Sequence, residues 1–164
     1  MNPSDIFVIS AVRSAIGSFG GSLKDVSPIQ LATDVCRAAI ERSGLAPEHI
    51  GHVVMGHVIP TEPRDAYISR AVGMNAGLPK ETPAFNVNRL CGSGLQAIVS
   101  AAQSLMLGDA GAALAGGVES MSRGAYLLPQ ARWGATSIGT IWSVNRPSAI
   151  ARAARCWLSS ANSS

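Results

Sequence analysis

The feature that most constrains the fold of this chain is a regular alternation of strand-like and helix-like segments. The strand-like segments are short and apolar, and each is followed by a stretch with helix caps or helical spacing of apolar residues. Strand-like character is found in residues 5–14, 52–59, 83–88 and 110–120, and helical character in residues 27–45, 63–78 and about 91–108. This order is typical of an α/β fold, in which helices cover both faces of one sheet.

The first helical segment carries the clearest boundary signals. Ser27 is suited to the N-cap and Pro28 to the first turn. Gln30 stands where a capping box needs it, and Gly44 follows the last helical residue. Cys36 lies on a row of apolar residues spaced four apart, which predicts that its thiol faces the core.

The charge distribution argues against nucleic acid as a partner. The chain has 164 residues, of which 13 are basic and ten acidic, and all ten acidic residues lie at or before Glu119. The formal net charge of +3 is therefore confined to residues 136–164, which contain three arginines and no acid. Residues 1–135 are neutral and have no basic cluster that could follow a phosphate backbone.

Residues 136–164 also break the pattern of alternating segments. They have two of the three tryptophans and no clear helix cap or hydrophobic period. One interpretation is a basic tail that binds an anionic partner. The interpretation we favour is a poorly ordered tail, not homologous to the rest, after a domain of residues 1–135. A shift of reading frame just after Ala135 is one hypothesis for the break, and the other two frames of the gene would test it.

Cysteine usage and the N-terminus favour a cytoplasmic location. Cys36, Cys91 and Cys156 are odd in number and far apart, which suggests neither a disulfide framework nor a zinc site. The N-terminal segment has Asp5 and no basic stretch before its short apolar run, unlike a secretory signal or a transit peptide.

An uncharged run, residues 90–108, approaches the length of a membrane-spanning helix. Its glutamines, serines and glycines are poor lipid-facing residues. A helix that is apolar nearly all round also suits the interior of a soluble domain. We therefore expect a buried helix and no membrane partner.

Cys91 stands directly before this helix, in the sequence NRLCGSGLQAI. The first N–H groups of a helix lack intrahelical partners, and the helix dipole stabilises a thiolate there. Gly92 and Gly94 leave room for a bulky thioester, and the N–H of Cys91 is placed to donate to an oxyanion. This pattern suggests acyl transfer through a covalent thioester. A structural role is the alternative, and it is the commoner one for an isolated cysteine.

Four stretches resemble motifs of a known family and follow one another in the order found in that family. They are SAVRSAIGSFGGSL, GHVIPTEPRDAYISR, NRLCGSGLQAI and GGVESMSRGAYLLPQARWGA. Over residues 5 to about 135 the chain is similar to the thiolase family, the acetyl-CoA acetyltransferases or β-ketothiolases. The resemblance implies a thiolase-like N-terminal domain with a mixed five-stranded sheet between helices. It implies that Cys91 is the acylated nucleophile of an acyltransferase. It also implies coenzyme A thioesters as substrates rather than cofactors, and assembly as a homo-oligomer.

The chain departs from this family where the second half of a thiolase would follow. That half supplies the catalytic base and further oxyanion donors in motifs of the types Asn-Glu-Ala-Phe, Gly-His-Pro and Cys-x-Gly-Gly-Gly, and none occurs here. The loop domain and the last strand of the first half are also absent. We therefore expect an incomplete fold and a truncated, weakly active or inactive chain.

Two classes of function stay open. The first is an acyltransferase half that a C-terminal half supplied elsewhere completes. The second is a non-catalytic fragment that only associates with thiolase-type partners, through the strand expected at residues 83–88.

The remaining polar residues receive no catalytic role. His49, His52 and His57 lack the spacing of metal ligands, and we expect neither a metal nor a bound cofactor. Glu119 and Arg123 follow the fourth strand-like segment, and we interpret them as a polar pair that fixes a turn.

A glycine cluster formed by Gly17, Gly20 and Gly21 follows the first strand-like segment. It lacks the spacing of a phosphate-binding loop, and no helix starts directly after it. The cluster therefore predicts a tight loop rather than a phosphate site.

Overall fold

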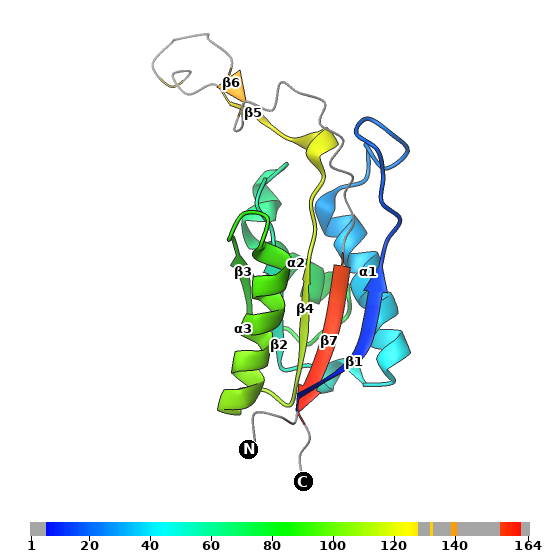
Figure 1. The fold of residues 1–164 in the computed structure, drawn as a ribbon, viewed down its shortest axis with the longest axis vertical. Coiled ribbons are helices and arrows are strands. Elements are labelled where there is room, and N and C mark those ends of the chain that lie inside the picture. The colour runs from blue at the N-terminus through cyan, green and yellow to red at the C-terminus, as the bar shows by residue number, and fades with distance from the viewer. Residues whose placement is uncertain (1–5, 128–131, 133–138, 141–154, 162–164) are drawn as a thin grey trace.

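A five-stranded sheet lies between helices in the computed structural model, which describes residues 6–127, 132, 139–140 and 155–161 (Figure 1). The helices are α1 (Pro28–Ser43), α2 (Ile68–Asn75) and α3 (Ser93–Leu107). The strands of the sheet are β1 (Ile6–Arg13), β2 (His52–Gly56), β3 (Ala84–Val87), β4 (Ala112–Gly117) and β7 (Arg155–Ala161). Three short 3-10 helices are η2 (Pro47–His49), η3 (Pro63–Tyr67) and η4 (Met121–Arg123), and β5 (Tyr126–Leu127) pairs with β6 (Gly139–Thr140).

The sheet is mixed, with strand order β1-β7-β4-β2-β3. β2 runs parallel to both β3 and β4, whereas β7 runs antiparallel to its neighbours β4 and β1. The expected α/β fold with a mixed sheet between helices is thereby confirmed. The expected edge strand is also found, because β3 lies at the end of the order.

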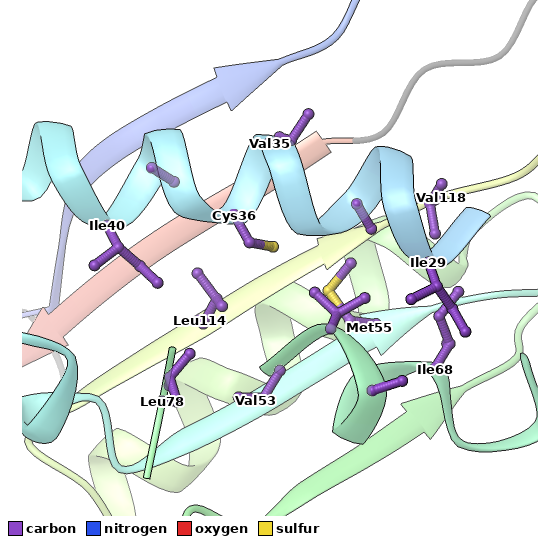
Figure 2. Packing of buried hydrophobic residues seen from close by; sticks show 14 of the residues in the cluster. Ile29, Val35, Cys36, Ile40, Val53, Met55, Ile68, Leu78, Leu114 and Val118 are labelled. Carbon is purple, nitrogen blue, oxygen red and sulfur yellow. The ribbon is translucent and has the colours of Figure 1, made fainter. Parts of the chain in front are cut away.

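Alternate residues of the central strands point into two separate cores. Val53, Met55 and Leu114 pack under α1 and α2, together with Cys36 of α1, as Figure 2 shows. Val54 packs on the opposite face under α3. This period of two is the reason that one short apolar strand can serve two layers of helices. Cys36 is fully buried, as its place in the sequence predicts.

Helix α1 begins and ends where its sequence predicts. The Ser27 hydroxyl accepts the N–H of Gln30 at 3.1 Å, and Gly44 closes the helix with a φ of 72°. Only half of the expected capping box forms, because the Gln30 side chain donates to Asp34 instead, at 2.8 Å.

The helical segment expected at residues 63–78 is shorter and is divided in two. Residues 63–67 form the 3-10 helix η3, and α2 then runs only to Asn75. The break comes at Tyr67, the last residue of η3, whose φ of −131° lies outside the helical range. The buried Asp65 carboxylate accepts the N–H groups of Thr61 and Glu62 and holds η3 as a tight turn.

The structure differs from expectation in the last part of the chain. Residues 155–161 lie in the segment interpreted as a poorly ordered tail, yet they form β7, between β1 and β4. The pairing extends over the whole strand, from Ile6 opposite Ala161 to Arg13 opposite Arg155. A strand between two others is held by its backbone on both sides, so it forms without a strong side-chain period. The rest of residues 136–164, apart from 139–140, lies outside the described part.

Helix α3 is buried on one side only. Its residues facing the sheet are Ser93, Ala97, Ala101, Ser104 and Leu105. Its opposite side exposes Leu95, Val99, Met106 and Leu107. By length and composition alone the window Leu90–Leu107 would qualify as a membrane span, the one such window in the described residues. The expectation of a helix buried all round is therefore wrong for this chain, which covers only one face of α3.

Candidate active site

Cys91 lies in a sharp turn between β3 and α3, and its side chain is exposed. The residue before it, Leu90, has a φ of 49°, in the left-handed region that residues other than glycine rarely adopt. Such conformations cost free energy and are found preferentially at functional sites. The turn therefore presents the thiol outward at the start of the helix, rather than folding it into the core.

Ser93 holds the turn together through its side chain. Its hydroxyl accepts the backbone N–H of Arg89 at 2.9 Å and donates to the carbonyl oxygen of Leu90 at 2.6 Å. The backbone closes the same turn, since Gly92 N–H donates to the Arg89 carbonyl at 3.0 Å. Three hydrogen bonds within five residues fix the direction in which Cys91 points.

Two strand-end glycines form a floor beneath the first turn of α3. A Cβ atom on Gly56, the last residue of β2, would lie 2.6 Å from the carbonyl carbon of Ser93. A Cβ atom on Gly117, the last residue of β4, would lie 3.3 Å from the Cα of Gly94. We call Gly56 and Gly117 the glycine floor. Without side chains there, the helix backbone packs directly on the ends of the two strands.

This geometry suits a cysteine nucleophile. Cys91 stands at the positive end of α3, beside first-turn N–H groups that have no place in the helix ladder. Such groups stabilise a thiolate and can donate to an oxyanion that forms on a bound carbonyl compound. Among the described residues, no side chain forms a hydrogen bond or ion pair with the Cys91 thiol. The site therefore offers a nucleophile and backbone donors, without a neighbouring proton carrier in this part of the chain.

We expect Cys91 and Cys36 to differ sharply in reactivity toward iodoacetamide. Cys91 is exposed, whereas Cys36 lies in the core and reacts only when the domain opens. Peptide mapping by mass spectrometry should show modification of Cys36 slower by a factor of at least about 10³ in the folded chain. In a Cys91→Ser variant Cys36 should stay equally protected. Equal labelling of both cysteines in the native chain would contradict this geometry.

The three histidines do not come together. His49 is exposed in η2, and the His52 ring packs against Phe85 with its Nδ1 atom 2.9 Å from the carbonyl oxygen of Pro83. His57 is buried just beyond β2. Within the described residues no group of three or more His, Cys, Asp or Glu side chains is arranged to hold a metal ion.

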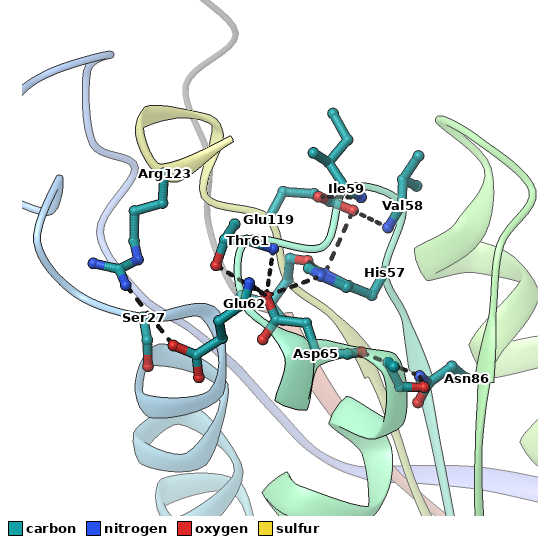
Figure 3. Close-up of polar contacts among 12 residues, drawn as sticks. Ser27, His57, Val58, Ile59, Thr61, Glu62, Asp65, Asn86, Glu119 and Arg123 are labelled. Atoms are coloured by element: carbon teal, nitrogen blue, oxygen red, sulfur yellow. Dashed lines mark hydrogen bonds and ion pairs between the residues drawn. The ribbon is translucent and has the colours of Figure 1, made fainter. Parts of the chain in front are cut away.

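Glu119 and Arg123 bind different segments of the chain. Glu119 accepts the N–H groups of Val58 and Ile59, which follow β2 (Figure 3). Arg123 lies 3.8 Å from the Glu62 carboxylate and donates to the carbonyl oxygen of Asp25. The expectation of a polar pair that fixes one turn differs from these contacts, in which each side chain binds a different segment of the chain.

The glycine cluster after β1 forms a turn. Gly20 has a φ of 69°, and Gly21 N–H donates to the carbonyl oxygen of Ser18 at 3.0 Å. The Gly20 N–H donates to the Ser122 hydroxyl of η4 at 2.9 Å, which ties this loop to the segment after β4. The interpretation as a tight loop agrees with this geometry.

Sequence reasoning missed the glycine floor and the buried side chains around it. Gly56, His57 and Asp65 gather at one end of the sheet. All three belong to the family-like stretch GHVIPTEPRDAYISR, but the sequence alone assigns none of them a role in a site. The available signal was the position of Gly56 and Gly117 at the ends of two apolar strands, where a missing side chain permits close backbone approach.

Comparison with known proteins places the chain beside a set of acyl-transferring enzymes. The family model described as the N-terminal domain of thiolase matches residues 6–144. The beta-ketothiolase BktB of Cupriavidus necator is 57% identical over 131 residues, which are 80% of this chain and 33% of that protein. The mitochondrial 3-ketoacyl-CoA thiolase of Bos taurus is 42% identical over 135 residues, 82% of this chain and 34% of that protein.

Solved structures show the same likeness. The acetyl-CoA acetyltransferase of Bacillus anthracis superposes with a TM-score of 0.78 at 39% identity, over 83% of this chain and 35% of that one. Human mitochondrial 3-ketoacyl-CoA thiolase in complex with CoA gives a TM-score of 0.78 at 39% identity, over 81% of this chain and 34% of that one. The present chain thus spans about a third of the length of these relatives.

Proposed function

The chain belongs to the thiolase family, and from this premise we propose that Cys91 accepts an acyl group from an acyl-coenzyme A thioester. The observation that carries the proposal is the exposed thiol on a strained turn at the start of α3. Relatives named as a beta-ketothiolase and as acetyl-CoA acetyltransferases support coenzyme A thioesters as the substrate class. Coenzyme A is then a substrate, and the chemistry requires no metal and no further cofactor.

The proposed step is an exchange of thioesters. The Cys91 thiolate attacks the carbonyl carbon of the acyl-coenzyme A, and the carbonyl oxygen takes the negative charge. Backbone N–H groups in the first turn of α3 that take no part in the helix ladder donate to this oxyanion. The bond to the coenzyme A sulfur then breaks, and the released thiolate takes up the proton that Cys91 gave to solvent. The products are acyl-Cys91 and free coenzyme A.

Transfer of this acyl group onward needs groups that move protons at the acceptor. No described side chain forms a hydrogen bond or ion pair with the Cys91 thiol, so the described residues supply only the first half of such a reaction. We propose that the complete reaction, acyl transfer between two coenzyme A thioesters, requires a second half of the fold. A polypeptide of these 164 residues alone is expected to show little or no turnover, because removing one member of a coupled catalytic unit costs most of the rate.

The experiment is incubation of the chain with acetyl-CoA, followed by intact-mass and peptide mass spectrometry. We expect one acetyl group on Cys91, none in a Cys91→Ala variant, and an unchanged adduct in a Cys36→Ala variant. Free coenzyme A should appear in an amount equal to that of the acetylated chain. A folded wild-type chain that forms no acetyl adduct would contradict the proposal.

The second candidate is a non-catalytic fragment that associates with thiolase-type partners. The observation in its favour is the outer edge of β3, which pairs with no other strand among the described residues and where Phe85 is exposed. An open strand edge is a template for pairing with another chain. Stable co-purification with a full-length thiolase, together with no acetylation of Cys91, would favour this candidate over the first.

A further inference from the structure

His57 is a buried residue that the proposed acyl transfer does not use. It follows directly after β2, and its side chain is only 2% exposed. Its Nδ1 atom lies 2.7 Å from the carbonyl oxygen of Val118. A carbonyl oxygen can only accept, so Nδ1 carries the proton of this hydrogen bond.

His57 connects the ends of three neighbouring strands. Its backbone N–H donates to the carbonyl oxygen of Val87, the last residue of β3, at 3.2 Å. Its side chain binds Val118, which follows the last residue of β4. The N–H of Val118 in turn donates to the Gly56 carbonyl at 3.1 Å, which closes the connection between β2 and β4.

Two carboxylates enclose the imidazole ring (Figure 3). Glu119 has an oxygen 3.8 Å from Nδ1, while Asp65 has an oxygen 3.7 Å from Nε2. Asp65 is itself held by the backbone N–H and the hydroxyl of Thr61, at 2.7 and 2.9 Å. The hydrogen bond from Nδ1 to Val118 orients the ring, while Nε2 is buried without a hydrogen-bond partner among the described residues.

The strand ends that His57 connects carry the glycine floor. Gly56 immediately precedes His57, and Gly117 immediately precedes Val118. The first turn of α3 rests on both glycines, within contact distance of their backbone. The separation of the two strand ends therefore sets where this turn lies. Because Cys91 is fixed to the same turn, its position depends on the same separation.

We propose that His57 is a positioning residue for Cys91, acting through its Nδ1–H bond to Val118 and the glycine floor. The inference rests on the proposed function only in taking Cys91 as the reactive group. It requires no acyl-coenzyme A to be tested, because the thiol can be probed by a simple alkylating agent.

The experiment compares three variants of the full chain: His57→Asn, His57→Gln and His57→Leu. An asparagine amide places its N–H donor close to the position of Nδ1, whereas a glutamine amide places it near Nε2. The measurements are the rate of Cys91 alkylation by iodoacetamide and the amide chemical shifts of residues 91–94. Thermal unfolding of each variant reports separately on stability.

We expect His57→Asn to keep the wild-type alkylation rate and amide shifts. His57→Gln and His57→Leu should lower the rate by about fivefold or more, the factor that corresponds to one lost hydrogen bond. They should also move the amide signals of residues 91–94. A role in stability alone would lower the melting temperature and leave both measurements in the folded state unchanged.

The proposal is overturned if folded His57→Leu and His57→Gln chains alkylate at the wild-type rate with unmoved amide signals. It is equally overturned if His57→Asn behaves like His57→Leu or does not fold, because a donor at the Nδ1 position is then insufficient. A wild-type chain that reacts with iodoacetamide but not with acetyl-CoA would contradict the proposed function and leave this comparison fully valid.

Discussion

Replacing Gly56 by alanine is expected to destabilise the domain by about 3 kcal/mol and to slow the alkylation of Cys91. The added methyl group would lie 2.6 Å from the Ser93 carbonyl carbon and 2.8 Å from the Gly94 nitrogen. Both are backbone atoms and cannot rotate away, so the start of α3 has to move off the sheet. Urea unfolding measures the first effect, and iodoacetamide kinetics of the folded variant measures the second.

The matched control is Gly111→Ala. A Cβ atom on Gly111 would meet no atom within 4 Å, and its φ is not positive. We expect this variant to stay within about 0.5 kcal/mol of the wild type, as is usual for surface substitutions. If Gly56→Ala were as stable as Gly111→Ala, the first turn of α3 would not rest on the end of β2.

The sequence was sufficient to predict the parts of the site that are local. The turn at Cys91, the helix after it and the caps of α1 are each encoded by a few adjacent residues. Such signals are visible because a cap or a glycine acts on its own neighbours. The layered α/β architecture followed from the alternation of strand-like and helix-like segments along the chain.

The glycine floor could not be predicted, because it depends on which strands become neighbours. Gly56 and Gly117 are 61 positions apart, and Ser93 lies between them in sequence. Only the parallel pairing that sets Gly56 opposite Gly117 brings both under the start of one helix. The buried contact of His57 with Val118 arises from the same pairing and could not be predicted from the sequence either.

The extent to which α3 is buried also could not be predicted from the sequence alone. An uncharged helix is compatible with cover on one face or on both. In this chain the face that includes Leu95 and Met106 stays exposed. The uncharged sequence of α3 therefore does not show by itself which of its faces is covered.

Ending the chain at residue 135 is expected to abolish cooperative folding. The truncation removes β7, whose backbone pairs with β1 on one side and with β4 on the other. Without it, β1 loses every strand contact that the structure describes, and the inner edge of β4 is opened. Domains of this size are stable by only about 5–15 kcal/mol, so the loss of a central strand exceeds what the remaining packing can offset. Circular dichroism with urea unfolding measures the change.

A chain ending at Ala161 is the control, since it keeps all of β7, and it should unfold like the full chain. A Leu158→Pro variant tests the same strand without shortening the chain. Leu158 lies opposite Ser10 of β1 and Leu114 of β4, and proline cannot donate to a ladder on either side. The sequence-based division at residue 135 gives the opposite expectation, because a tail without a place in the domain can be removed at no cost. Equal stability of the chains ending at 135 and at 161 would therefore restore that division and exclude β7 from the sheet.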